Sequence, residues 1–266
     1  MQAKMNILLT NDDGISANGL LKLAEVLRSR GEHNVFVLAP DSNRSGVSHG
    51  FTLLRNPLKL AEIDRDTYSC PGKPVDCAML PILGGRPCKP DVVISGINHG
   101  ANLGTDIIYS GTAAAARQAA LLGVPGIALS LDGRKDFYWD MAANYAADHL
   151  DEFIALWKED VFINVNIPNN PKGPSGQVQT WPAVKDYHDR IEFMKDPHGK
   201  DWVFFLSGKE TVAPEAGSDY DAISKNLVSI SPVCVYPVVR RDLCPGVPDY
   251  ASAGKRNFQR SSQWKA

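Results

Sequence analysis

Residues 5–14 read MNILLTNDDG, a short apolar run that ends in a polar and acidic loop. A run of this length is typical of a buried strand in a parallel sheet. Apolar residues then recur at helical spacing from Leu20 to Arg30, and Gly31 follows at the position where many helices end. The stretch therefore predicts a strand, a loop and a helix, which is the repeating unit of α/β folds.

The same unit recurs through the first 170 residues. Further apolar runs predict strands at residues 34–39, 91–95, 124–131 and 161–167, and helical patterns lie between them at residues 75–83, 111–123 and 137–157. Strands that alternate with helices pair in parallel through right-handed crossovers. Residues 1–170 are therefore predicted to form a three-layer, doubly wound (Rossmann-like), mostly parallel α/β sheet that serves as the catalytic core.

Residues 171–266 differ from this core in composition and in the pattern of their apolar residues. From Gln177 to Pro237 the sequence is rich in aromatic and β-branched residues, so we expect a C-terminal β-rich arm or hairpin on the α/β body. The tail from Arg240 to Ala266 has few apolar residues, and we expect it to wrap a partner subunit or to be loosely ordered. The stretch from Phe51 to Tyr68 alternates weakly and is predicted to be a strand.

The composition argues against several classes of protein. A net charge of -2 with 22% charged residues does not suit a protein that coats nucleic acid. No apolar run is long enough to span a bilayer, and the chain opens directly into its first strand without a signal-peptide pattern, so we expect a cytoplasmic protein. The five cysteines show no C-x-x-C spacing and predict neither a disulfide framework nor a zinc site.

Polar loops follow three of the predicted strands, at residues 11–14, 43–46 and 96–104. Parallel strands bring such loops to one edge of the sheet, where open α/β folds bind their ligands. The loops supply the carboxylates of Asp12 and Asp13, the hydroxyl of Ser45 and the amide of Asn98, which are hard oxygen donors suited to Mg²⁺, Mn²⁺ or Ca²⁺. Adjacent carboxylates also repel each other unless a cation neutralises them. The pattern predicts a metal site; the alternative is that Asp-Asp-Gly forms an ordinary turn.

A candidate anion site lies at Tyr109-Ser110-Gly111-Thr112, directly before the alanine-rich helix. Backbone N–H groups at a helix start carry partial positive charge and bind phosphate. The alternative is that Ser110 or Thr112 only caps the helix. His49 and His99 flank the loops as candidates for substrate contact or proton transfer, and Arg44 and Lys73 could neutralise phosphate; for each of these four, an ordinary solvated or hydrogen-bonded side chain is the alternative.

These residues carry a resemblance to the survival protein SurE family of nucleotidases. The matching motifs are ILLTNDDGI (7–15), APDSNRSG (39–46), GKPVDC (72–77), VVISGINHGANLG (92–104), YSGTAAAA (109–116) and ALSLDG (128–133). GSDYDAI (217–223) and VSISP (228–232) extend the resemblance into the arm. Residues 181–207 depart from it, being poorer in arginine than the corresponding stretch of the family.

The resemblance implies an activity and a set of site residues. It implies hydrolysis of nucleoside 5′- and 3′-monophosphates, and a homodimer or homotetramer formed by exchange of C-terminal segments. One divalent ion, Mg²⁺ or Mn²⁺, is implied, with its ligands at Asp12, Asp13, Ser45 and Asn98. Phosphate binding or ordering of the pocket is implied for Asn43, Ser110, Gly111 and Thr112. Asp12, Asp13 and Asn98 are the expected catalytic residues.

The sequence supports one hypothesis for the mechanism and leaves two alternatives to it open. Our hypothesis is that Asp12 activates or positions a water molecule that attacks phosphorus in line with the leaving ribose oxygen. A covalent aspartyl-phosphate route would use the carboxylate as nucleophile, but the D-x-D spacing of that chemistry is missing. The chain could instead be a non-catalytic nucleotide-binding regulator that uses the same crevice only to sense a ligand.

Overall fold

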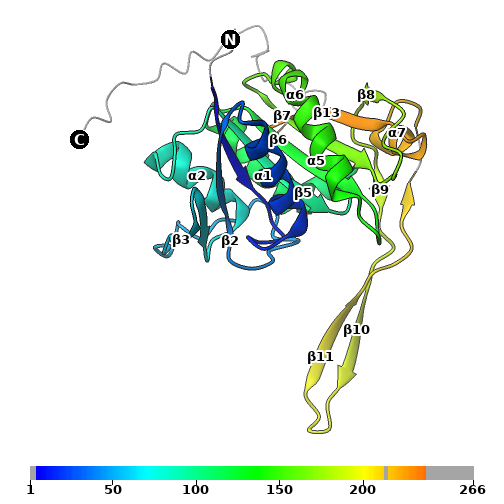
Figure 1. Cartoon of the computed structure of the whole chain (residues 1–266). Coiled ribbons are helices and arrows are strands. Elements are labelled where there is room, and N and C mark those ends of the chain that lie inside the picture. The colour runs from blue at the N-terminus through cyan, green and yellow to red at the C-terminus, as the bar shows by residue number, and fades with distance from the viewer. Residues whose placement is uncertain (1–3, 213–214, 238–266) are drawn as a thin grey trace, which may run out of the picture. The chain divides into compact units, whose positions relative to one another are not determined.

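The computed structural model of this 266-residue chain describes residues 4–212 and 215–237 (Figure 1). Within them, a 9-stranded sheet has the order β3-β4-β2-β1-β5-β6-β7-β13-β8. The bounds are β1 Asn6–Thr10, β2 Asn34–Pro40, β3 Ala61–Asp64, β4 Thr67–Cys70, β5 Val92–His99, β6 Gly126–Asp132, β7 Val161–Pro168, β8 Gln177–Gln179 and β13 Val228–Cys234. Only the β3–β4 and β7–β13 pairings within this sheet are antiparallel, so the predicted mostly parallel α/β sheet is confirmed.

The strand order reverses beside β1. From β1 the chain builds outward through β2 and β4, and it then crosses to the other side of β1 to add β5, β6 and β7. β1 and β5 pair in parallel from Ile7–Val92 to Thr10–Ser95. In open α/β sheets, ligands bind outside the carboxyl ends of the strands at such a switch point. Here that place is occupied by the Asp12-Asp13 loop after β1 and by Asn98 near the end of β5.

Helices cover both faces of the sheet and make three layers. α1 (Asn18–Arg30), α5 (Trp139–Asp148) and α6 (Leu150–Leu156) pack on the face that carries Ile7 and Leu9. α2 (Pro74–Gly84) and α4 (Gly111–Leu121) pack on the opposite face against Leu8. Figure 1 shows α1 and α5 together on the near side of the sheet. Successive side chains of β1 thus point into two separate apolar cores. Because both faces of the strand are buried, its sequence is an unbroken apolar run.

Three predicted element boundaries were wrong. Residues 51–60 form no strand, because the backbone N–H groups of Thr52 and Leu53 donate to the Asp76 carboxylate, at 2.8–3.0 Å, instead of to a neighbouring strand. β5 continues to His99, through residues expected to be loop, with an irregularity between Ser95 and Asn98. The helix expected over residues 137–157 is divided at His149 into α5 and α6.

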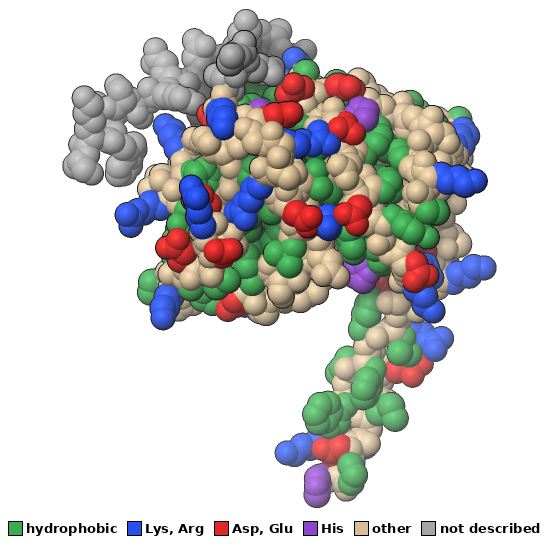
Figure 2. Space-filling view, in the orientation of Figure 1, with side chains coloured by type: hydrophobic (Ala, Val, Ile, Leu, Met, Phe, Trp, Pro, Cys, Tyr) green, Lys and Arg blue, Asp and Glu red, His purple; other side chains and the backbone are tan. Residues whose placement is uncertain are grey.

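The described part of the segment after residue 170 contributes strands to three sheets. β8 and β13 join the central sheet, so the sheet extends beyond the core predicted from sequence. Among the described strands, β10 (Arg190–Lys195) and β11 (Asp201–Leu206) pair with each other alone, as an antiparallel hairpin. Figure 2 shows hydrophobic side chains along this hairpin, and Phe193 is 71% exposed. Two short strands, β9 (Lys185–Asp186) and β12 (Thr211–Val212), pair at its base.

Two further features complete the fold. The short helix α7 (Asp219–Ser224) was not expected in a β-rich segment; its first turn is capped by Ser218, whose hydroxyl accepts from the N–H of Asp221 at 3.2 Å. The tail from Arg240 to Ala266, expected to wrap a partner or to be loosely ordered, lies outside the described residues. Among the residues described, no helix is long and apolar enough to cross a membrane.

Candidate functional site

The loop after β1 is held rigidly by its own side chains. Asn11 is fully buried; its amide donates to the carbonyl of Gly14 at 2.9 Å, and its side-chain oxygen accepts from the N–H of Gly14 at 3.1 Å. Gly14 has a φ of 102°, and a Cβ atom there would lie 3.0 Å from the carbonyl carbon of Ser42. The loop therefore turns sharply against the loop that follows β2, and this geometry fixes the two carboxylates between its ends.

Asp12 connects three of the four predicted site segments. Its side chain accepts a hydrogen bond from the hydroxyl of Thr112, at the start of α4. Its backbone carbonyl accepts from the N–H of Arg44 at 2.6 Å, in the loop that carries Asn43 and Ser45. Asp12 is only 4% exposed, and Thr112 is fully buried. Residues about 100 positions apart in sequence are thus joined through one carboxylate group.

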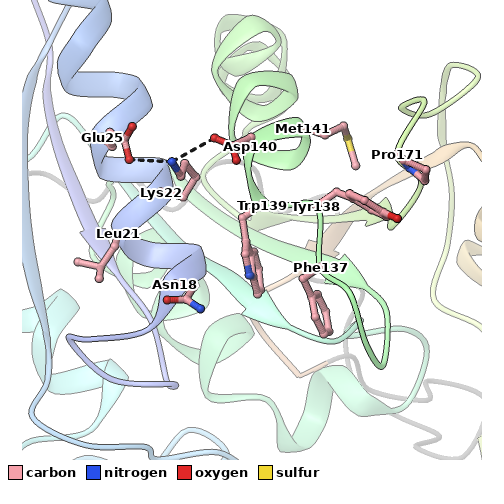
Figure 3. A pocket seen from close by; sticks show the side chains of 10 residues that line it. All are labelled: Asn18, Leu21, Lys22, Glu25, Phe137, Tyr138, Trp139, Asp140, Met141 and Pro171. Atoms are coloured by element: carbon pink, nitrogen blue, oxygen red, sulfur yellow. Dashed lines mark ion pairs between the residues drawn. The ribbon is translucent and has the colours of Figure 1, made fainter.

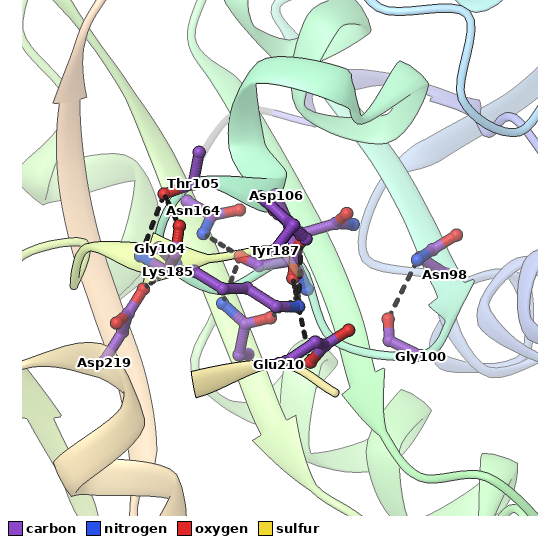
Figure 4. Close-up of polar contacts among 12 residues, drawn as sticks. Asn98, Gly100, Gly104, Thr105, Asp106, Asn164, Lys185, Tyr187, Glu210 and Asp219 are labelled. Carbon is purple, nitrogen blue, oxygen red and sulfur yellow. Dashed lines mark hydrogen bonds and ion pairs between the residues drawn. The ribbon is translucent and has the colours of Figure 1, made fainter. Parts of the chain in front are cut away.

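Asp13 connects the same loop to β5. One carboxylate oxygen of Asp13 accepts from the backbone N–H of His99 at 3.1 Å, next to Asn98. The amide nitrogen of Asn98 donates to the carbonyl of Gly100 at 2.8 Å, as Figure 4 shows, so the amide oxygen of Asn98 is left as its available donor atom for a ligand. The switch point between β1 and β5 therefore gathers two carboxylates and an amide oxygen.

The loop after β2 presents Asn43 and Ser45, both exposed. The side-chain oxygen of Asn43 accepts from the N–H of Ser45 at 2.7 Å, so in this structure Asn43 shapes its own loop. Ser48 ties the loop to the segment before α4, because its N–H donates to the carbonyl of Tyr109 at 3.0 Å. The structure therefore brings all the predicted site residues to one edge of the sheet.

The start of α4 combines a cap with a close backbone approach. Ser110 is the N-cap, and its hydroxyl accepts from the N–H of Ala113 at 3.0 Å, so the capping alternative holds for this side chain. A Cβ atom on Gly111 would lie 2.8 Å from Cβ of Asp12 and 3.1 Å from Cγ of Pro74. Glycine is therefore needed for the positive end of the helix dipole to approach the Asp12 carboxylate.

The surroundings of both carboxyl groups make their ionised forms less favourable, and a nearby cation would offset this cost. Burial raises the pKa of Asp12; the hydrogen bond from Thr112 opposes this shift, and the neighbouring charge of Asp13 adds to it. Burial also raises the pKa of Asp13, against the hydrogen bond from the N–H of His99. A divalent ion would remove both penalties. No cluster of three or more His, Cys, Asp or Glu suited to a metal occurs among the described residues, so a cation here needs neutral oxygens such as those of Ser45 and Asn98.

The four secondary candidates have different surroundings. Nε2 of His49 hydrogen-bonds the side-chain oxygen of Gln118 at 2.8 Å, and burial lowers the His49 pKa. Arg44 pairs with Asp41 at 2.9 Å, so its charge is already partly neutralised. Lys73 is the N-cap of α2 and lines a surface pocket of about 490 Å³ with His49 and Arg55. His99 is exposed and contacts the ring of Phe137.

An aromatic surface lies beside Asp13, formed by His99, Phe137 and Trp139. The ring of His99 meets that of Phe137 edge to face, with centroids 4.1 Å apart, and Phe137 stacks on Trp139 at 4.9 Å and 10°. Phe137 and Trp139 also line a pocket of about 480 Å³ between α1 and the start of α5 (Figure 3). Sequence reasoning missed this surface, because residues 137–139 were assigned to the start of a helix.

A polar cluster behind the anion site was also missed. The ammonium group of Lys185 contacts both carboxylate oxygens of Asp106, at 3.0 and 2.9 Å, and Glu210 at 2.9 Å, while the hydroxyl of Tyr187 donates to Asp106 (Figure 4). Asp106 begins the short helix α3 (Asp106–Tyr109), which runs into Ser110. No short-range pattern links Asp106 to Lys185, 79 residues away, so the sequence carried no signal for this pairing.

This cluster anchors the base of the hairpin to the site, and its loss should be measurable. The side chain of Lys185 is 6% exposed; burial lowers its pKa, but Asp106 and Glu210 outweigh that effect and raise it. We expect Lys185→Met to lower the free energy of unfolding by about 2 kcal/mol, because two carboxylates lose their cation. Urea unfolding measures the change. Lys225→Met, which removes the more exposed Lys225–Asp221 pair, is the matched control and should cost less than about 0.5 kcal/mol; equal losses would contradict the anchoring role.

Comparisons with a family model, with known sequences and with solved structures all match this chain to one family. The family model described as "Survival protein SurE" matches residues 7–189. Two relatives named "5'-nucleotidase SurE" are similar: one from Geobacter metallireducens is 40% identical over 86% of this chain and 91% of its own length, and one from Vibrio parahaemolyticus is 41% identical over 87% and 89%. The crystal structure of the SurE protein from Aquifex aeolicus superposes with a TM-score of 0.77 at 36% identity, covering 90% of this chain and 96% of that one. This chain belongs to the SurE family.

Proposed function

We propose that this chain is a divalent-metal-dependent phosphatase, a 5′-nucleotidase that hydrolyses nucleoside 5′- and 3′-monophosphates to nucleoside and phosphate. The observation that carries the proposal is the position of Asp12, a buried carboxylate at the switch point of the sheet that contacts the start of a helix. The family membership and the names of the relatives support the same activity.

The proposed cation ligands are Asp12, Asp13, Ser45 and Asn98. Their oxygen atoms suit Mg²⁺ or Mn²⁺, and the raised pKa values of the Asp12 and Asp13 carboxyl groups support a cation at this place. When bound there, a divalent ion supplies positive charge that polarises a phosphoryl group and lowers the pKa of water.

The remaining chemistry is assigned to groups of the protein. Asp12 positions the water that attacks phosphorus, and the hydroxyl of Thr112 holds the Asp12 carboxylate in place through its hydrogen bond. Ser110, Gly111 and Thr112 lie at the positive end of α4, where backbone N–H groups stabilise the phosphoryl oxygens. Asn43 orders the facing loop through its bond to Ser45. Asp12, Asp13 and Asn98 are the proposed catalytic residues.

Release of inorganic phosphate tests this function. We expect the protein to release phosphate from AMP and GMP in the presence of Mg²⁺ or Mn²⁺, and to release none when EDTA is added. Restoring the cation in excess should restore the rate, which separates metal removal from denaturation. Binding of AMP with no phosphate release at any metal concentration would favour the non-catalytic regulator instead. A trapped phosphorylated enzyme would favour the covalent aspartyl-phosphate route.

We also propose that the chain forms a homodimer or homotetramer, by exchange of segments within residues 171–266. The hairpin of β10 and β11 supports association, since a two-stranded ribbon with exposed apolar side chains is marginal in water by itself. The exposed apolar side chains are Ile191, Phe193, Met194, Trp202, Val203, Phe204 and Phe205. Sedimentation equilibrium measures the oligomeric state, and a monomer at micromolar concentration would contradict the proposal.

A further inference from the structure

We propose that the aromatic surface of His99, Phe137 and Trp139 is the subsite for the nucleobase of the substrate, an inference that rests on the proposed nucleotidase function. Aromatic side chains bind bases of any sequence, because every base has a π-face that stacks on a ring. The surface begins at His99, whose backbone N–H donates to the carboxylate of Asp13 at 3.1 Å. The rings therefore start one residue from a proposed metal ligand.

Packing holds the rings of Phe137 and Trp139 in place. Phe137 and Trp139 are half-buried and pack against the apolar core, and they stack on one another with their planes only 10° apart. Trp139 also closes over Gly19 at the start of α1, where a Cβ atom would lie 2.8 Å from its ring and 2.1 Å from the carbonyl oxygen of Ile97. Because these rings have little freedom to lose, stacking a base on them costs little conformational entropy.

The adjoining pocket offers room and polar groups for the rest of a nucleoside. Asn18 is exposed at the start of α1, and the pocket of about 480 Å³ lies between this helix and residues 137–141. Figure 3 shows the rings of Trp139 and Phe137 next to each other beside this helix. The volume is in the range typical of small-molecule sites, and an amide can hydrogen-bond the edge of a base.

The second pocket near the site has a different chemistry. It is lined by Lys73, Arg55 and His49, and Phe51 is the one Phe, Tyr or Trp ring among the described residues that line it. Cationic side chains suit an anionic group rather than a neutral base. The observations therefore favour the aromatic surface of His99, Phe137 and Trp139 for the base, and they make Phe51 the matched control.

The test compares two substrates that differ only in the base. AMP and ribose 5-phosphate carry the same phosphate ester on ribose, so a base subsite affects the first alone. We expect Phe137→Ala to raise the KM for AMP about tenfold, the effect of losing one base–aromatic stack, while the kcat and KM for ribose 5-phosphate stay within twofold of the wild type. Phe137→Leu keeps apolar volume in the core and should show the same selectivity if it is the ring that matters. Phe51→Ala should leave both substrates unchanged.

Several outcomes would overturn the assignment. An equal loss of activity with both substrates would make Phe137 a structural support of His99. No change with either substrate would place the base elsewhere. An AMP-selective loss in Phe51→Ala would place the base in the second pocket.

Adenosine binding, measured by the quenching of tryptophan fluorescence, tests the subsite without any phosphate release. We expect binding to wild type and a roughly tenfold weaker affinity for Phe137→Ala. Adenosine binding without hydrolysis of AMP would refute the proposed function and retain the subsite, whereas no adenosine binding would refute the subsite.

Discussion

Replacing Asp12 by asparagine is expected to lower kcat for AMP about 10³-fold or more while the fold is retained. Asparagine has nearly the same shape, and its oxygen can still accept the hydrogen bond from Thr112. It lacks the negative charge that we assign to cation binding and to the positioning of water. Phosphate release under saturating Mn²⁺ measures the loss, and circular dichroism checks the fold.

The stability of this variant gives an independent check. Since burial raises the pKa of Asp12 in the folded state, the ionised carboxylate lowers stability at pH values above its ordinary pKa, and the loss grows until the folded-state pKa is passed. Asp12→Asn should therefore melt at the same temperature as the metal-free wild type or higher at pH 7, and it should lose the stabilisation that Mn²⁺ gives the wild type. Asp160→Asn, which changes an exposed carboxylate directly before β7, is the control. Normal turnover in Asp12→Asn would remove Asp12 from the mechanism.

Gly111→Ala is expected to lower kcat/KM for AMP about 100-fold, through geometry alone. The added methyl group would lie 2.8 Å from Cβ of Asp12 and 3.0 Å from its carboxylate oxygen, so the carboxylate or the start of α4 must move. No charge and no hydrogen-bonding group is removed. Steady-state kinetics, well below the melting temperature, separate this displacement from the modest destabilisation that overpacking causes.

Gly84→Ala is the matched control for that variant. Gly84 is the last residue of α2, and a Cβ atom there would have no atom of the described part of the chain within 4 Å. We expect it to keep wild-type kinetics and the same or slightly higher stability, since alanine favours helix more than glycine does. If Gly111→Ala and Gly84→Ala had the same kcat/KM, the close approach of α4 to Asp12 would have no role in the reaction.

Local sequence patterns predicted the central sheet because its inner strands are buried on both faces. β1 and β2 are apolar runs that end at polar loops, and Gly31 has the positive φ of 67° expected of a helix-ending glycine. The polar loops after β1 and β2, together with the end of β5, were therefore placed correctly at one edge. The candidate donor residues could be proposed from sequence because Asp12, Asp13 and Ser45 lie in the polar loops that follow β1 and β2, and Asn98 lies at the end of β5.

What the sequence could not predict depends on contacts between distant segments. The weak alternation of residues 51–60 resembles a strand, yet the Asp76 carboxylate takes the N–H groups of Thr52 and Leu53 that a strand would use. Gly96 and Asn98 gave β5 the composition of a loop, although the strand continues to His99 beside β6. The Lys185–Asp106 pair likewise exists only once the chain has folded.

The central claim is that Asp12, Asp13, Ser45 and Asn98 surround one cation. The most direct measurement is an anomalous difference map, recorded at the manganese edge, from crystals grown with Mn²⁺. The account predicts a single strong peak within coordinating distance of the Asp12 and Asp13 carboxylates, the Ser45 hydroxyl and the Asn98 amide oxygen, and no such peak in Asp12→Asn crystals. A peak held by other residues, or none at this edge of the sheet at saturating Mn²⁺, would contradict it.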